Sequence, residues 1–160
     1  MLQNLPRAAA FSLALLLTAT LAGSSLAARG STLRTLHFYT TETSFDYTAP
    51  NGKHPTAPPA NPKPGASFDE TDVAYAGSYR KHSHIATGSS HLHCLYQAAG
   101  RLDCHSQIAI NGSLILAHGD AHIAMTIVGG TAKFLHATGR ITATPAGAGV
   151  NATIVYHTNN

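Results

Sequence analysis

The sequence predicts an all-β domain with antiparallel strands, arranged as a barrel or a sandwich. Beyond an apolar N-terminal segment, no sustained periodicity of 3.6 residues indicates an amphipathic helix. Short runs rich in β-branched and aromatic residues recur instead, separated by glycine, asparagine and aspartate. A series of about eight closely spaced strands is typical of barrels and sandwiches.

The candidate strands follow one another closely along the chain. Each holds β-branched or aromatic residues, and turn-forming residues separate most of them. The expected strands are 32–41, 67–76, 82–86, 90–96, 101–110, 113–118, 121–128, 139–144 and 151–157. Residues 45–66 interrupt the series because they contain six of the eight prolines. We expect a long proline-rich loop there, and such loops in compact domains are usually functional or disordered.

The N-terminal segment has the features of a secretory signal peptide. Arg7 supplies a positive charge, residues 8–21 form an apolar run too short to span a bilayer, and small residues end at Ala27. We therefore predict a signal peptide at 1–27, a single domain at 28–160 and a secreted, extracellular protein. An uncleaved membrane anchor is the alternative. After cleavage, no second apolar run is long enough for a membrane helix.

The charges are few and scattered. Ten Lys and Arg against seven Asp and Glu give a net charge of +3, and the largest basic cluster is Arg80-Lys81. This distribution argues against a nucleic-acid partner, which would need a basic patch. Charged residues make up only 11% of the chain. So little charge favours a homo-oligomer that covers part of the surface.

Two cysteines set the register of one hairpin. In an exported chain, Cys94 and Cys104 predict a disulfide. If the two cysteines face each other, His93 faces His105 and the connecting loop is centred on Ala99. Closing so short a loop should stabilise the fold by roughly 2–3 kcal/mol.

Three dipeptides predict tight turns: Asn111-Gly112, Gly119-Asp120 and Gly129-Gly130. Alternation along the strands then sorts the side chains into two faces. One face is expected to carry Leu92, Cys94, Tyr96, Leu102, Cys104, Ile108 and Ile110. The other is expected to carry His91, His93, Leu95, Asp103, His105 and Gln107, followed by Leu114, Leu116, His118, Ile123, Met125 and Ile127. Both faces are partly apolar, as in a barrel with a buried outer surface.

Eleven histidines are unusual for a chain of this size. His82 and His84 share one strand face, as do His91 and His93, and His105 would lie across the hairpin from His93. Converging imidazoles suit Zn²⁺ or Cu²⁺, which makes His91, His93 and His105 candidate ligands. The sequence fixes no carboxylate beside them. A polar sheet surface facing solvent also explains them, and we predict no metal.

No motif for a nucleophile, a metalloprotease or a phosphate-binding loop occurs. The remaining chemistry is confinement, in which a shaped apolar pocket and a few polar groups steer a reactive molecule. Asn111 and Asn151 begin glycosylation sequons.

Residues 125–134, Met-Thr-Ile-Val-Gly-Gly-Thr-Ala-Lys-Phe, are followed by Ala-Thr-Gly-Arg-Ile at 137–141. Together they closely resemble the "VVGGTGxF…ARG" segment of the dirigent and allene oxide cyclase barrel families, with Ala132 replacing the third turn glycine. The aromatic run 35–42 resembles the first barrel strand of these families, and Glu42 stands at its acidic position.

Three further segments extend the likeness, which covers about residues 32–157. Residues 65–75 resemble the "GDxFxFxDxLY" strand of bacterial relatives, where Asp72 and Tyr75 match. The cysteine hairpin resembles their "G…C…C" hairpin, and residues 112–119 resemble "GSxIxxxG". The chain is thus similar to secreted, bacterial-type dirigent-like proteins.

The resemblance implies an eight-stranded antiparallel β-barrel, often a trimer, that works without a metal or organic cofactor. Plant members direct the coupling of phenoxy radicals or cyclise an allene oxide, commonly with a lumen carboxylate as acid or base. That role falls here to Glu42, with Asp72 second. Desolvation would raise the pKa of such a carboxyl and suit it to proton transfer. The candidate binding residues are Phe38, Tyr75, Lys133, Phe134 and Arg140.

We therefore expect a secreted, cofactor-independent barrel that binds an apolar small molecule of the phenolic or oxidised fatty acid class. It would guide cyclisation, as an isomerase, or stereoselective coupling. The sequence leaves open whether the protein is an enzyme. The alternatives are a non-catalytic carrier, a histidine-based metal-binding protein and a barrel whose lumen is filled by side chains.

Overall fold

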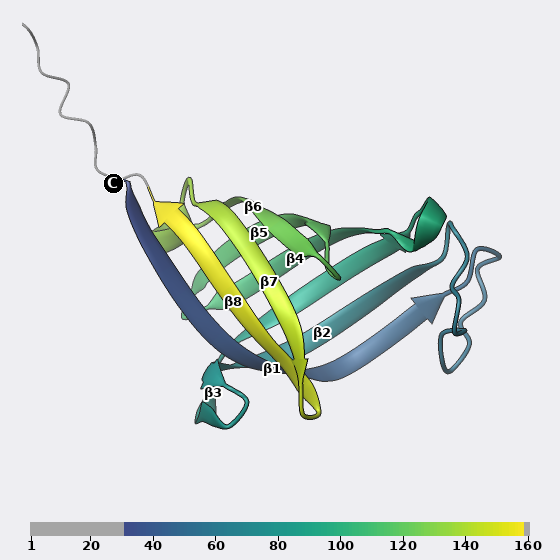
Figure 1. Ribbon diagram of the computed structural model, residues 1–160, viewed down its shortest axis with the longest axis horizontal. Coiled ribbons are helices and arrows are strands. Elements are labelled where there is room, and N and C mark those ends of the chain that lie inside the picture. Colours follow the sequence, from purple (N-terminus) through teal and green to yellow (C-terminus); the bar gives the residue numbers. More distant parts are fainter. Residues whose placement is uncertain (1–30, 159–160) are drawn as a thin grey trace, which may run out of the picture.

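The computed structural model describes residues 31–158, in which the strands close into one antiparallel barrel (Figure 1). Strands neighbouring in sequence are neighbours in the sheet, and β8 pairs with β1 to close it. This confirms the eight-stranded antiparallel barrel rather than the sandwich. The strands are β1 (Thr32–Thr48), β2 (Ser67–Ser78), β3 (Lys81–Tyr96), β4 (Leu102–Ile110), β5 (Ser113–Asp120), β6 (Ala124–Gly130), β7 (Thr138–Ala146) and β8 (Gly149–Thr158). Two short 3₁₀ turns are η1 (Ala98–Gly100) and η2 (Ala132–Phe134).

The two strands predicted at 82–86 and 90–96 are one continuous strand, β3. Glycine between them does not end the strand. A Cβ atom on Gly88 would lie 2.2 Å from the carbonyl oxygen of Ala109, so glycine allows β4 to approach closely.

The strand β1 is longer than predicted because it continues through a bulge. Glu42 pairs with Asp72 and Ser44 with Thr71, so Thr43 is the extra residue. Residues 32–37 of β1 pair only with β8 and residues 38–40 pair with both β8 and β2, whereas the second half of the strand pairs only with β2. Figure 1 shows this second half running beside β2 past the turn between β7 and β8. The proline-rich loop therefore begins after Thr48 and not at residue 45.

The predicted turn at Gly119-Asp120 lies slightly later, at residues 121–123. The Asp120 carboxylate accepts a hydrogen bond of 2.9 Å from the backbone N–H of His122 and fixes the turn there. Asp120 pairs with Ala124 across three residues, so alternation places Met125 and Ile127 inside the barrel. The prediction that Met125 and Ile127 share the outer face with His118 is wrong for this reason.

The predictions for the two hairpins that join β3, β4 and β5 are confirmed. Cys94 faces Cys104 in a disulfide, and His93 faces His105. Ala99 has φ of 60° at the centre of the connection. At the next turn, Asn111 and Gly112 both have positive φ, 47° and 73°, as a type I′ turn requires.

The prediction of a tight turn at Gly129-Gly130 is wrong, because both glycines still belong to β6. The reversal follows it, at η2. A Cβ atom on Gly130 would lie 2.3 Å from the Leu114 carbonyl oxygen and 2.8 Å from Phe134 Cβ. The Phe134 side chain is fully buried and meets the Tyr156 ring edge-on at 5.3 Å. This segment therefore packs an aromatic plug into one end of the barrel.

The predicted signal peptide, 1–27, lies outside the described residues, so its cleavage stays a prediction. Within 31–158, no helix has the length and apolar character needed to cross a membrane.

We expect Phe134→Ala to lower the free energy of unfolding by about 3–5 kcal/mol, because it leaves a cavity at the plugged end. Phe45→Ala is the matched control, since Phe45 is 38% exposed. That variant should cost clearly less. Urea denaturation of both variants measures the difference, and equal losses would contradict the plug.

Candidate functional site

The barrel encloses a cavity of about 410 Å³. A volume of this size lies within the range of small-molecule pockets. Inward-facing residues from seven of the strands line it, and most are apolar. The apolar wall comprises Phe38, Phe68, Ala74, Leu92, Leu102, Ile108, Met125, Ile141, Ala143, Pro145, Val150, Ala152 and Ile154. The alternative of a lumen filled by side chains therefore does not hold for this structure.

The cavity lies toward the end of the barrel opposite the Phe134 plug. His122, in the turn between β5 and β6, lines the cavity and is exposed to solvent. His122 also borders a groove formed by Pro58 to Pro62 and Tyr96, so the proline-rich loop lies beside the mouth. Backbone hydrogen bonds of 2.9 Å and 2.8 Å join Gly65 and Ala66 to Tyr96 and hold the end of this loop.

Three carboxylates gather on one side of this apolar wall. Glu70 and Asp72 alternate on β2 and both line the cavity. Glu42 pairs with Asp72 across the two strands at the bulge and is exposed. Ser90, from β3, donates a hydrogen bond of 2.8 Å to Asp72 Oδ2 and orients that carboxylate.

Glu70 is the group whose protonation the site changes most clearly. Burial in the apolar wall raises the pKa of Glu70 from about 4.5 to about 7, and the Asp72 charge, a hydrogen bond with Asp72 and the Glu42 charge add to this effect. At neutral pH the Glu70 side chain therefore exchanges between carboxyl and carboxylate. A group in that state can both give and take a proton.

The predicted site residues fall into two groups. Phe38 and Asp72 line the cavity, and Glu42 lies beside Asp72 at its edge. Glu70 was missed, although its alternation with Phe68 and Asp72 is the signal that would have placed it on the same face.

Four predicted binding residues do not line the cavity. Tyr75 packs its ring against His82 at 5.4 Å. Phe134 forms the plug, and the Lys133 ammonium lies 4.9 Å from the centre of the Phe134 ring. Arg140 is exposed and alternates with Ile141, which lines the cavity.

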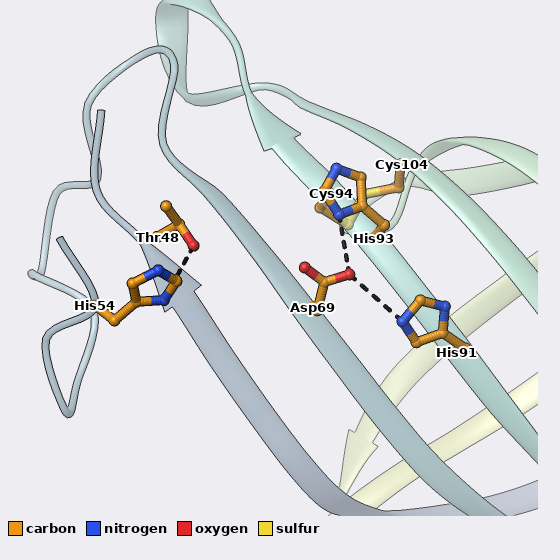
Figure 2. A network of polar contacts seen from close by, with 7 residues as sticks. All are labelled: Thr48, His54, Asp69, His91, His93, Cys94 and Cys104. Atoms are coloured by element: carbon orange, nitrogen blue, oxygen red, sulfur yellow. Dashed lines mark hydrogen bonds and ion pairs between the residues drawn. A yellow bond between two sulfur atoms is a disulfide. The ribbon is translucent and has the colours of Figure 1, made fainter. Parts of the chain in front are cut away.

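The candidate metal-binding histidines do not form one cluster. Figure 2 shows Asp69 between two of them, with His91 Nε2 at 3.4 Å and His93 Nδ1 at 3.0 Å from Asp69 Oδ1. The His105 ring instead lies against the His118 ring, 4.6 Å between centres. The same figure shows His54, from the proline-rich loop, hydrogen-bonded to Thr48 at 3.3 Å.

Comparison with known proteins gives matches in structure and not in sequence. No family model and no curated protein matches the chain. A pyocyanin demethylase superposes with a TM-score of 0.60 at 14% identity, covering 77% of this chain and 99% of that one. The pterocarpan synthase dirigent protein GePTS1 superposes with a TM-score of 0.54 at 16% identity, covering 80% of this chain and 84% of that one. The pterocarpan synthase dirigent protein PsPTS1 superposes with a TM-score of 0.51 at 20% identity, covering 80% of this chain and 92% of that one. The chain thus has the dirigent-like barrel fold.

Glu70 should make the stability of the protein depend on pH. The pKa of Glu70 is higher in the folded state than in the unfolded chain. Its contribution to stability is therefore most favourable below about pH 4.5 and is lost as the pH rises to about 7. In the wild type, this effect should lower the free energy of unfolding by roughly 1–2 kcal/mol between pH 4.5 and 7, a figure that allows for partial solvation of the carboxyl. Glu70→Gln should abolish this loss.

Urea denaturation between pH 4 and 8 measures this slope. Asp72→Asn is the companion variant. It removes one charge and one hydrogen bond but leaves the burial of Glu70, so the slope should weaken without vanishing. An identical slope in wild type and Glu70→Gln would refute the assignment.

Proposed function

We propose that this protein is a secreted, cofactor-independent barrel that binds an apolar small molecule in its lumen and guides the cyclisation or stereoselective coupling of that molecule. The observation that carries the proposal is the cavity of about 410 Å³, whose wall is apolar except for a few polar groups, chiefly the carboxylates on one side. An apolar wall binds and orients a ligand, and the localised polar groups act on one part of it.

The carboxylates supply the chemistry in this proposal. Glu70, with a pKa of about 7, gives a proton to the ligand or removes one from it. Asp72 keeps its position through the Ser90 hydrogen bond and adds to the effect of burial in raising the pKa of Glu70. Negative charge on Asp72 and Glu42 would also stabilise a positive charge that develops on the ligand.

The names of the structural neighbours support the class of ligand. A pterocarpan synthase and a pyocyanin demethylase both act in the chemistry of small organic molecules, and both have this barrel. At identities of 14–20% they support a small organic ligand by analogy, and the phenolic or oxidised fatty acid class is proposed from the resemblance of the sequence segments.

We also propose a homo-oligomer, such as a trimer, because large apolar side chains remain exposed on the barrel. Leu33 is 58% exposed, Ile85 77% and Val128 63%. Light scattering on the purified protein gives the mass directly, and a monomer at micromolar concentration would remove this proposal.

Binding is tested with the neutral fluorophore N-phenyl-1-naphthylamine, displaced by phenols and by oxidised fatty acids. We expect saturable fluorescence in the wild type and at least about a tenfold loss of affinity in Ala152→Phe, which places a ring in the cavity. Thr153→Phe is the matched control on the next, outward-facing position of β8. Equal binding by both variants would place the fluorophore outside the lumen.

Turnover is tested on any compound that displaces the fluorophore. Glu70→Gln should lower the rate by roughly 10²–10⁴-fold, the usual contribution of a general acid or base, while fluorophore affinity changes little. Glu42→Gln should have a smaller effect because Glu42 lies at the edge. Displacement without any product in the wild type would identify a carrier and not a catalyst.

A further inference from the structure

A second cluster of chemically active side chains lies on the outer wall of the barrel, separate from the lumen. Asp103 and His105 alternate on β4, and His118 lies directly opposite His105 on β5. Each residue offers one metal-ligating atom, and these atoms all lie within 4.8 Å of one another. Among the residues described, 31–158, this is the one group of three or more that meets that condition.

The strand pairing places the ligating atoms of two imidazoles and one carboxylate close together. His118 Nε2 and Asp103 Oδ1 are 2.6 Å apart. The His105 and His118 rings are 4.6 Å apart between centres and inclined by 32°. We propose that Asp103, His105 and His118 bind a divalent transition-metal ion of the zinc and copper class. Two histidines and one carboxylate are a common ligand set for Zn²⁺, with a further position open to water or another ligand.

The existing hydrogen bond shows how a cation would enter. One proton now holds His118 Nε2 and Asp103 Oδ1 together. A metal ion would replace this proton between the same two atoms, and the neutral His118 ring would then carry its proton on Nδ1. Without a metal, a pair in which both side chains are about half exposed adds little to stability.

The backbone beneath the cluster is held in place. Cys104 lies between Asp103 and His105 in sequence, faces inward and is bonded to Cys94 of β3. Two of the three ligands therefore flank a covalent link between strands, and the third lies on the next paired strand. Ligands on such a rigid surface need little rearrangement to bind.

The surroundings extend the site and do not compete with it. Asp69, His93, His105 and His118 lie directly opposite one another on four successive strands. Figure 2 shows the Asp69 and His93 end of this row, in which His93 Nδ1 contacts Asp69 at 3.0 Å. The carboxylates of Asp69 and Asp103 thus flank the imidazoles and favour a cation.

The test uses the purified protein, prepared without a polyhistidine tag and dialysed against a chelator, with ZnCl₂ as the probe. Calorimetry should give one Zn²⁺ per chain at micromolar concentration. The variants His105→Ala and His118→Ala should each weaken binding at least about tenfold. His37→Ala is the matched control, because His37 is an exposed histidine on β1 whose hydrogen-bond partner is Thr153, outside the cluster.

Spectroscopy with Co²⁺ gives a second reading. Its visible absorption should show a low-coordinate site with nitrogen and oxygen ligands, which His118→Ala removes and His37→Ala keeps. A rise in Tm with Zn²⁺ in the wild type and in His37→Ala, but not in His105→Ala, would confirm that the folded state binds the ion.

Two outcomes would overturn the proposal. One is no Zn²⁺ or Cu²⁺ binding at micromolar metal by the folded wild type. The other is binding that His91→Ala or His93→Ala abolishes while His105→Ala and His118→Ala do not, since the ion would then lie at Asp69. Circular dichroism of each variant separates these results from loss of folding.

Discussion

Closure of the sheet by β1 is the constraint on which the rest of the structure depends. Residues 32–40 of β1 pair with β8 and, from residue 38 onward, β1 pairs with β2, so the two pairings overlap at residues 38–40 and close the barrel there. After the bulge at Thr43, β1 pairs only with β2. Phe134 plugs one end of the barrel, and at the other end β1, β2 and β3 extend toward the proline-rich loop.

The electrostatics of the lumen follow from this asymmetry. In a fully enclosed wall, three neighbouring carboxylates would be too costly to charge, and in open solvent they would behave as ordinary acids. At the boundary between these environments, Glu42 is exposed while Glu70 and Asp72 are partly buried. Glu70 acquires a pKa of about 7, chiefly because burial disfavours its charged form and also because Asp72 and Glu42 are near. One carboxyl is thereby poised for proton transfer.

The same strand alternation that directs apolar side chains into the lumen directs polar, ionisable side chains onto the outer wall. Cys94 and Cys104 face inward in the barrel wall, whereas the residues beside them, His93, Asp103 and His105, face outward. Register places histidine opposite histidine on three successive strands. The lumen and the outer cluster are thus separate consequences of one pairing pattern.

The sequence by itself determined features whose causes are local. The cysteine pair set the register of β3 and β4, and Asn111-Gly112 set the next turn, because two residues with positive φ allow only one tight hairpin. Tertiary structure decided what depends on distant partners. A turn of three residues after Asp120 reversed the faces assigned to Met125 and Ile127. The close approach of Phe134 to Gly130 moved the chain reversal to η2 and buried the Phe134 ring in one end of the barrel. Asp72 is a neighbour of Glu70 within β2, but Glu70 gained its raised pKa only when closure of the barrel placed the apolar wall around it and β1 brought Glu42 near.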